Sequence, residues 1–276
     1  MSTIDLEQLL PQLQLEADFD ASAFVPSVYN NTYYAEVMED ERCLIEWQAT
    51  KLDYIIQKHL GSIGLERFPL HFDAGSGPSV HHLLALEKYS DALDLADYLP
   101  ENLAEIRGWV EGTDPNAHNW KPFAREILAA EGLRATEEAV VVREQAVKDK
   151  IRSYNPLDFK EPTEEMLKYK APFVTSFFVA DSATGDKQVF ADMTKNAFNI
   201  VAAGGLFVAA YLGGCKEYAV GDKWIKSADL SEDDLRSVFA DSGAEEFTVE
   251  RFNTPTLAEE GFNHIFAVTA KAPLSY

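Results

Sequence analysis

One short segment, residues 72–80 with the sequence FDAGSGPSV, constrains the fold of this chain more than any other. Apolar residues lead into a Gly-Ser-Gly-Pro turn, after which a helix is predicted to begin near Pro78. A second apolar segment ends at Asp97, 20 residues beyond Gly77. A strand, a glycine turn, a helix and a second strand with a terminal acid are typical of a nucleotide or nucleoside site in an α/β protein.

The residues of this segment suit a particular kind of ligand. Gly75 and Gly77 have no Cβ, so the backbone can turn sharply and approach a ligand closely. The carboxylate of Asp97 can accept hydrogen bonds from two ribose hydroxyls. A dinucleotide site would have a third glycine, but His81 or His82 stands at that position. A ligand with a ribose and no pyrophosphate fits better, and S-adenosylmethionine is the leading candidate; the alternative is a tight turn without a ligand.

The composition narrows the expected partners and location of the protein. The chain has 24 Lys and Arg against 46 Asp and Glu, which gives a formal net charge of −22. Such an acidic surface repels phosphate groups, so neither nucleic acid nor an anionic membrane is an expected partner. Cys43 and Cys215 have no metal-binding spacing, and we expect no metal site. With no secretory signal and no long apolar run in the sequence, a cytoplasmic location is expected.

Strand and helix signals alternate along most of the chain. A single domain is predicted over residues 1–276, with a helical cap or lid in residues 1–66 and an α/β core in residues 67–276. A strand is predicted to end at Asp181. The alternation indicates a doubly wound sheet whose ligands bind at the carboxyl ends of its strands.

Several segments resemble a known enzyme family in their order and spacing. They are FVPSVYNNTYY, FDAGSGPSVHHLL, ADYLPENL, HNWKPF, VTSFFVAD and GGLFVAAYLGGCKEYAVG. Over residues 24–272 the chain resembles the nicotinamide, phenylethanolamine and indolethylamine N-methyltransferases, which are class I S-adenosylmethionine enzymes. The resemblance implies a Rossmann-like fold with a mostly parallel seven-stranded sheet, helices on both faces and an N-terminal helical lid. It also implies transfer of a methyl group from S-adenosyl-L-methionine, with S-adenosyl-L-homocysteine as product.

The resemblance assigns cofactor-binding roles to ten residues. It implies that leader tyrosines cover the cofactor, that the glycine turn lies beside its methionine part, and that Asp97 binds the ribose. Tyr98 is expected to flank the adenine, and Asn155 stands where relatives contact the adenine edge. His81 replaces a tyrosine that contacts the carboxylate end in relatives. The predicted set is Tyr29, Tyr34, Gly75, Ser76, Gly77, His81, Asp97, Tyr98, Asn102 and Asn155.

The resemblance also implies a pocket for the methyl acceptor. Asp181 and Tyr34 are the predicted catalytic residues. Asp181 would accept the proton of an amine or position it, or alternatively cap the helix that follows. The nicotinamide enzyme has an acid where Tyr211 stands, so we expect a different acceptor, an amine or a ring nitrogen. The predicted substrate-binding set is Tyr34, Asp181, Tyr211, Tyr218 and Asn263.

Two other functions remain open on the sequence alone. An NAD(P)-dependent oxidoreductase would use a similar turn, although the missing third glycine speaks against it. A non-catalytic protein could keep the cofactor fold as a sensor or a partner-binding module. The intact GSGP turn, Asp97 and the leader tyrosines favour a methyltransferase with a small-molecule acceptor, working as a monomer or a small homo-oligomer.

Overall fold

The computed structural model describes residues 24–220, 223–253 and 261–274. Within these ranges, seven strands form one sheet. They are β1 (His71–Ala74), β2 (Leu93–Asp97), β3 (Ile151–Pro156), β4 (Ala171–Phe177), β5 (Val201–Gly213), β8 (Glu245–Phe252) and β9 (His264–Lys271). The first 23 residues of the predicted cap lie outside the described ranges.

The strand order in this sheet is β3-β2-β1-β4-β5-β9-β8. β1 to β5 pair in parallel, whereas β9 runs antiparallel to both of its neighbours. The chain leaves β1 in one direction for β2 and later returns to the other side of β1 with β4. Loops after these two strands therefore diverge at the carboxyl edge, where doubly wound proteins bind ligands. The predicted mostly parallel seven-stranded sheet is confirmed.

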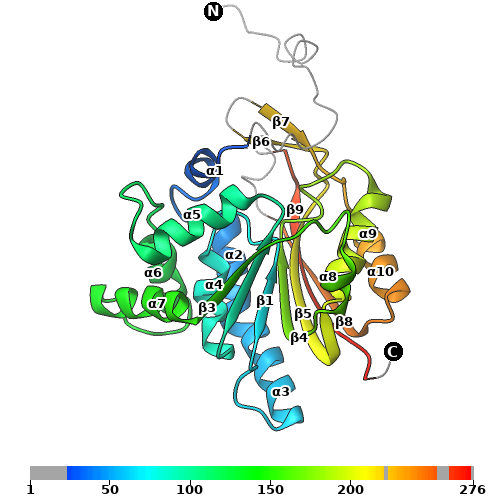
Figure 1. The fold of residues 1–276 in the computed structure, drawn as a ribbon, viewed down its shortest axis with the longest axis horizontal. Coiled ribbons are helices and arrows are strands. Elements are labelled where there is room, and N and C mark those ends of the chain that lie inside the picture. Colours follow the sequence, from blue (N-terminus) through cyan, green and yellow to red (C-terminus); the bar gives the residue numbers. More distant parts are fainter. Residues whose placement is uncertain (1–23, 221–222, 254–260, 275–276) are drawn as a thin grey trace, which may run out of the picture.

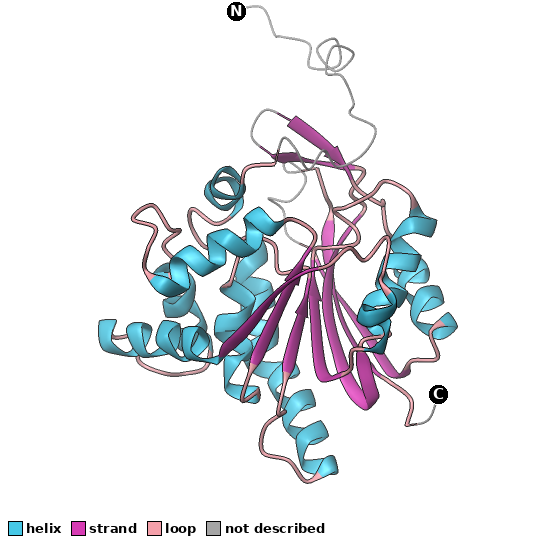
Figure 2. Ribbon diagram, viewed as in Figure 1, coloured by secondary structure: helices cyan, strands magenta, loops and turns pink. Residues whose placement is uncertain are grey.

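Helices cover both faces of this sheet, as Figure 2 shows. One face carries α2 (Glu39–Trp47), the π-helix η4 (Gln48–Leu52), α3 (Asp53–Ile63), α4 (His81–Leu86), the 3₁₀-helix η5 (Glu87–Tyr89), α5 (Pro100–Glu111), α6 (Lys121–Ala130) and α7 (Glu137–Lys150). The other face carries α8 (Glu164–Lys168), α9 (Lys187–Phe198) and α10 (Glu232–Asp241). Among the described residues, no helix combines the length and apolar character needed to cross a membrane.

The two layers bury two apolar cores, and neighbouring residues of one strand contribute to different cores. On β5, Leu212 belongs to the core under α2 to α7, whereas Tyr211 belongs to the core under α9 and α10. This is the ordinary consequence of the strand geometry, because successive side chains point to opposite faces of a sheet. It decides which β5 side chains can reach the site described below.

The predicted cap is only partly separate from the core. Helix α1 (Pro26–Tyr33) and the hairpin of β6 (Glu217–Val220) and β7 (Lys223–Lys226) lie together at one end of the molecule in Figure 1. Asn30 of α1 donates a hydrogen bond to the carbonyl of Pro78 in the glycine-turn region (3.2 Å). In contrast, α2 and α3 bury Leu44, Ile56 and other apolar residues in the main core. These two helices are thus part of the sheet's covering layer.

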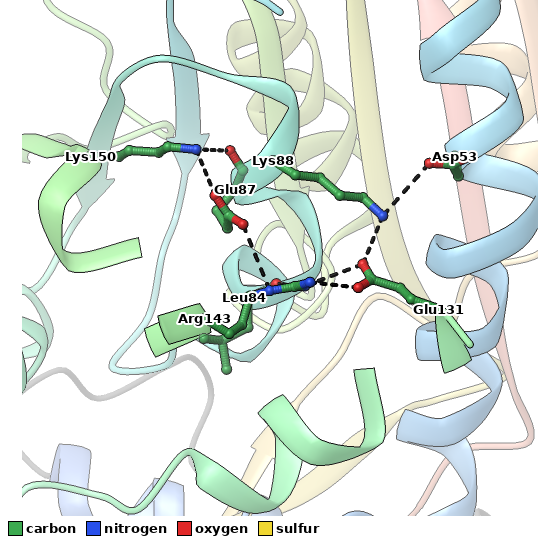
Figure 3. Close-up of polar contacts among 7 residues, drawn as sticks. All are labelled: Asp53, Leu84, Glu87, Lys88, Glu131, Arg143 and Lys150. Atoms are coloured by element: carbon green, nitrogen blue, oxygen red, sulfur yellow. Dashed lines mark hydrogen bonds and ion pairs between the residues drawn. The ribbon is translucent and has the colours of Figure 1, made fainter. Parts of the chain in front are cut away.

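An ion-pair network fastens α7 to the layer of helices around it (Figure 3). Arg143 donates to both carboxylate oxygens of Glu131 (2.5 and 3.2 Å). The same Glu131 accepts from Lys88 (2.7 Å), and Glu87 accepts from Lys150 (2.6 Å). Arg143, which also contacts Glu87 at 3.7 Å, is buried. The network holds α7 to η5 and to the end of α6, and none of its residues lines the ligand-sized cavities of the protein.

Candidate active site

The glycine turn after β1 is shaped by close contacts. The amides of Gly75 and Ser76 both donate to the carbonyl of Ala96 on β2 (2.8 Å each), which bends the chain sharply. Gly75 has a φ of +82°, and a Cβ there would lie 2.3 Å from Cγ1 of Val179. Only glycine combines the positive φ with the absence of a Cβ, so the backbone of the turn can lie directly against Val179 in the loop after β4.

The terminal acid of β2 bonds back to this turn. Oδ2 of Asp97 accepts from the amide of Gly77 (2.8 Å), and Oδ1 accepts from the amide of Leu99 (2.8 Å) and the side chain of Asn102 (3.0 Å). Burial raises the pKa of Asp97, although these three donors act in the opposite direction. Oδ1 of Asn102 is buried and has no hydrogen-bond partner among the described residues. The carboxylate of Asp97 and the amide of Asn102 are thus hydrogen-bonded to each other, and both side chains carry oxygens that can accept from the hydroxyls of a ribose.

A cavity of about 230 Å³ opens beside the turn and Asp97. Nine of the ten predicted cofactor-binding residues line it: Tyr29, Tyr34, Gly75, Ser76, Gly77, His81, Asp97, Tyr98 and Asn102. Three further residues that the sequence did not indicate, Asp158, Phe159 and Lys160, come from the loop after β3. The structure therefore brings together residues from four separate loops at the carboxyl edge of the sheet.

A smaller cavity of about 40 Å³ adjoins the large one. The two cavities have five lining residues in common: Tyr29, Tyr34, Phe178, Ser182 and Tyr218. The other lining residues of the small cavity are five largely apolar residues and two acids. They are Tyr33, Met38, Leu212, Phe262 and Ile265, with Asp40 and Glu41. The two cavities therefore adjoin each other across a shared wall that consists mostly of aromatic side chains.

Two acids at the start of α2 give the small cavity its charge. Asp40 and Glu41 both line it, and no lysine or arginine does so among the residues that the structure describes. Burial raises the pKa of Asp40. Oε2 of Glu41 lies 3.5 Å from Nε2 of His81. Burial lowers the pKa of His81 well below its ordinary value. His81 is therefore neutral near pH 7 and adds no positive charge beside the small cavity, whose two acids suit a cationic ligand.

Sequence reasoning missed these acids because they lie in the run EDER, which reads as the exposed first turn of a helix. Acidic residues are also favourable at a helix N-terminus for electrostatic reasons alone. The signal available was the position of the run, which directly follows the tyrosine-rich leader. The packing of α2 beside α6, together with the contact of Glu41 with His81 of α4, turns the acids toward the site.

The tyrosines of the shared wall remain protonated hydroxyl groups. Burial raises the pKa of Tyr29 to about 12 and the pKa values of Tyr34 and Tyr218 well above normal. The hydroxyl of Tyr218 donates to the carbonyl of Ser182 (2.9 Å), and Tyr34 packs against the ring of His81, with 4.5 Å between centroids. These side chains can shape the cavities and donate hydrogen bonds, but they cannot serve as bases near pH 7.

Asp181 lies behind the wall of the cavities and does not line either of them. Its Oδ2 accepts from the amide of Leu212 (2.8 Å), while Oδ1 has no partner among the described residues. Burial raises the pKa of Asp181 to about 7, against the effect of backbone donors. The alternative prediction, that Asp181 caps a helix, is wrong, because α9 is capped by Asp186, which accepts from the amides of Gln188 and Val189. β4 ends at Phe177, four residues before Asp181, so the strand predicted to reach Asp181 is too long.

Besides Asp181, two other predicted substrate-binding residues are not brought to the cavities. Tyr211 points to the opposite face of β5, where it packs against Phe190 with 5.4 Å between ring centroids. Leu212, the next residue, lines the small cavity instead. Asn263 is exposed and donates to the carbonyl of Gly214 (3.1 Å), so it fixes the chain before β9. For Tyr211 the correction comes from strand geometry, because a shift of one residue along a strand moves a side chain to the other face of the sheet.

Asn155, predicted at the adenine edge, is also absent from the large cavity. Its amide donates to the carbonyl of Leu95 (3.0 Å) and to the hydroxyl of Ser153 (2.9 Å), so it serves the β2–β3 pairing. The acid that lines the cavity from this part of the chain is Asp158. The pairing of β2 with β3 shifts register between Leu93 and Asp94, an irregularity that the sequence does not reveal.

Fold and site together define a class of protein. A sheet with this order, a glycine turn after its first strand and a buried acid ending its second strand is the class I methyltransferase arrangement. The model of the NNMT/PNMT/TEMT family matches residues 12–271. The chain belongs to this family, and it is an S-adenosylmethionine-dependent N-methyltransferase.

Individual relatives are distant. Human nicotinamide N-methyltransferase is 24% identical over 66% of this chain and 67% of its own length. Phenylethanolamine N-methyltransferase from Sus scrofa is 21% identical, covering 70% and 68%. Indolethylamine N-methyltransferase from Oryctolagus cuniculus is 22% identical, covering 80% and 82%. These comparisons give no support to the oxidoreductase alternative.

Solved structures resemble the chain at the level of the fold. Magnesium protoporphyrin IX methyltransferase from Synechocystis, solved with bound S-adenosylmethionine, aligns with a TM-score of 0.50 at 12% identity, covering 93% of this chain and 99% of that one. The CurJ carbon methyltransferase aligns with a TM-score of 0.53 at 9% identity, covering 91% and 62%. At such identities the likeness concerns the fold alone.

Proposed function

We propose that this enzyme transfers the methyl group of S-adenosylmethionine to the nitrogen of a small basic amine or basic ring compound bound in the small cavity. The observation that carries this proposal is the small cavity itself. It shares a wall with the larger cavity, its other walls are largely apolar, and two carboxylates face it without a lysine or arginine among the described lining residues. An organic cation of modest size matches both properties.

The residues of the large cavity fit the cofactor in one orientation. Asp97 and Asn102 would bind the ribose hydroxyls, because the two side chains are hydrogen-bonded to each other and both line the cavity beside the turn. The adenine would lie near Tyr98 and Phe159, with Asp158 available to accept from its amino group. This orientation places the methionine part along the glycine turn, toward His81. The buried side-chain atoms without protein partners around this cavity support a polar ligand there.

The same orientation directs the reacting end of the cofactor toward the shared wall. When bound, S-adenosylmethionine supplies a methyl group on a positively charged sulfur. The protein's contribution is then chiefly to align acceptor and donor, which Tyr29, Tyr34 and Tyr218 are placed to do. Phe178 and Leu212 exclude water from the acceptor side.

The acceptor nitrogen must lose a proton to complete the transfer. Asp40 and Glu41 can hold an ammonium in the small cavity and receive its proton, directly or through water. Asp181, the acid chosen from the sequence, is separated from the cavities and binds the amide of Leu212 instead. We therefore propose Asp40 and Glu41 as the acids that contact the acceptor, with Asp181 as a positioning residue for the end of β5.

These features favour a basic acceptor over nicotinamide. Nicotinamide is uncharged near pH 7 and gains little from two carboxylates, whereas a protonated amine gains a charge-assisted hydrogen bond. Tyr211 does not bear on the choice of acceptor, because its side chain lies on the other face of the sheet.

A binding and turnover experiment tests the proposal. Calorimetric titration with S-adenosylmethionine and S-adenosylhomocysteine is expected to show binding, with NAD as a negative control. Formation of S-adenosylhomocysteine is then measured with 2-phenylethylamine, tryptamine and nicotinamide as acceptors. We expect turnover with the two basic amines and none with nicotinamide. Cofactor binding together with turnover of nicotinamide alone would contradict the proposed acceptor class.

A further inference from the structure

A buried chain of polar side chains runs through the sheet and ends at the large cavity. Nε2 of His71 lies 2.7 Å from the hydroxyl of Thr175, which lies 2.6 Å from Oδ1 of Asp73. Nε2 of His82, on α4, lies 3.0 Å from both carboxylate oxygens of Asp73. None of the four side chains is more than 3% exposed. Such a network is specific in its donors and acceptors, because no water can complete it.

The direction of every hydrogen bond in this chain can be assigned. Burial alone would raise the pKa of Asp73, but its contacts with His82, His71 and Thr175 lower it to about 2. Asp73 is therefore an acceptor only, and Nε2 of His82 must carry a proton. Thr175 donates to Asp73 and so accepts from His71.

This arrangement fixes the ring of His82 as well as its proton. The imidazole stacks on Phe177, with 4.9 Å between centroids and 20° between planes. An imidazole that carries a single proton, on Nε2, has its lone pair on Nδ1. That Nδ1 is buried and has no hydrogen-bond partner among the described residues, although His82 lines the large cavity. A buried polar atom without a partner at the edge of a binding cavity points to a ligand atom.

We propose that His82, oriented by Asp73, accepts a hydrogen bond at Nδ1 from the α-amino group of the cofactor's methionine part. This inference rests on the proposed function, because it takes the orientation in which the methionine part follows the glycine turn. Of the two groups at that end of the cofactor, the amino group has protons to donate, whereas the carboxylate has none. His82 is thus a further cofactor-binding residue, and Asp73 is the positioning residue that sets its ring.

Two amide substitutions separate the two nitrogens of His82. His82→Gln places an amide near the position of Nε2, so it keeps a donor for Asp73 and loses the acceptor toward the cavity. His82→Asn places its carbonyl near the position of Nδ1, so it keeps the acceptor and leaves Asp73 without this donor. We expect His82→Gln to melt close to wild type but bind S-adenosylhomocysteine about tenfold more weakly. We expect His82→Asn to melt at lower temperature while keeping more of the affinity.

Three ligands, each titrated calorimetrically, identify the group that His82 contacts. S-Adenosylhomocysteine has both the amino group and the carboxylate, S-adenosyl-3-thiopropylamine has only the amino group, and 5′-methylthioadenosine has neither. His82→Gln is expected to weaken binding of S-adenosylhomocysteine and of the thiopropylamine by a similar factor. Binding of 5′-methylthioadenosine should be unchanged. Thr175→Val, which perturbs the network away from the cavity, serves as the control for a general structural effect.

The outcomes are distinguishable from failure of the proposed function. Wild-type protein that binds none of the three ligands would overturn the cofactor site itself. Equal weakening of all three ligands in His82→Gln, or the same pattern in Thr175→Val, would show a structural effect and overturn the inference alone. A loss for S-adenosylhomocysteine with unchanged binding of the thiopropylamine would assign His82 to the carboxylate and also overturn it.

Discussion

The carboxylate of Asp97 accepts a hydrogen bond from the amide of Gly77, so the acid that ends β2 closes the turn that follows β1. One side chain thus joins two loops of the large cavity. The spacing of 20 residues between them, visible in the sequence, is also a physical contact in the structure. A substitution at Asp97 therefore acts on the ligand and on the turn together.

We predict that Asp97→Asn weakens binding of S-adenosylhomocysteine about 10- to 100-fold, since charge-assisted hydrogen bonds contribute about 1.5–3 kcal/mol each. The amide keeps one acceptor oxygen, so one of the two backbone donors, Gly77 or Leu99, also loses its partner. Calorimetric titration measures the affinity. Asp94→Asn is the matched control, because Asp94 lies on the same strand but pairs with Arg152 and does not line the cavity. An affinity of Asp97→Asn within twofold of wild type would remove Asp97 from the ribose site.

The two glycines of the turn are expected to differ in their tolerance of alanine. Gly75→Ala places a methyl group against Val179 at a positive φ, and we predict a loss of at least about 2 kcal/mol in the free energy of unfolding. Gly77→Ala also has a positive φ, of +58°, but no atom lies within 4 Å of the added Cβ. Its loss is expected to be about 1 kcal/mol. Urea unfolding of both variants checks the order, and equal losses would refute the steric argument.

Replacing the acids of the small cavity by amides is expected to weaken binding of the acceptor and to leave binding of the cofactor unchanged. Glu41→Gln and Asp40→Asn should each raise KM for a basic amine about tenfold or more, because a charge-assisted hydrogen bond is lost. Affinity for S-adenosylhomocysteine is expected to stay within about twofold. Glu39→Gln is the matched control, since Glu39 is an exposed acid of the same helix turn. Unchanged KM values in both variants would place the acceptor elsewhere.

Asp181 is expected to make folding less favourable as the pH rises. Its pKa is about 7 in the folded protein against an ordinary 3.8, so between these values the folded state holds a proton that the unfolded state has lost. Wild-type stability should therefore fall, relative to Asp181→Asn, from pH 4 to pH 8, by up to about 4 kcal/mol. Chemical unfolding of both proteins over this range measures the difference, in which titrations elsewhere cancel. A difference independent of pH would show that the carboxyl titrates normally.

Arg143 is predicted to matter for stability and not for binding. Arg143→Met removes the partner of Glu131 and leaves two buried carboxylates, Glu131 and Glu87, with fewer cations (Figure 3). Breaking a buried pair in this way is expected to lower the free energy of unfolding by about 3–5 kcal/mol. Arg236→Met breaks an exposed pair with Glu232 and should lose less than about 1 kcal/mol. A loss of similar size in both variants would contradict the role of burial.

The parts of the site that were predictable are those that depend on local chain geometry. Gly75, Gly77 and Asp97 follow from a turn and the ends of two adjacent strands, and Asn102 follows in the next helix. The alternation of strands and helices was sufficient for the doubly wound sheet, because short connections force parallel strands to pack in this way.

The parts that were not predictable depend on packing between distant segments. Asp40 and Glu41 reach the small cavity because α2 packs beside α6, far along the chain. Tyr211 was assigned to the pocket where Leu212 lies, since no sequence signal fixes which face of a long apolar strand meets the ligand. The β6–β7 hairpin, which positions Tyr218, was not anticipated either, because two four-residue strands give almost no periodic signal.

Tyr29, Tyr34 and Tyr218 border both cavities, so each cavity is completed by side chains that the other also uses. We expect the first ligand that binds to restrict the side-chain motion of these tyrosines. The conformational entropy lost in that step need not be lost again. Cofactor product and amine are therefore expected to strengthen each other's binding, and by linkage the factor is the same in both directions.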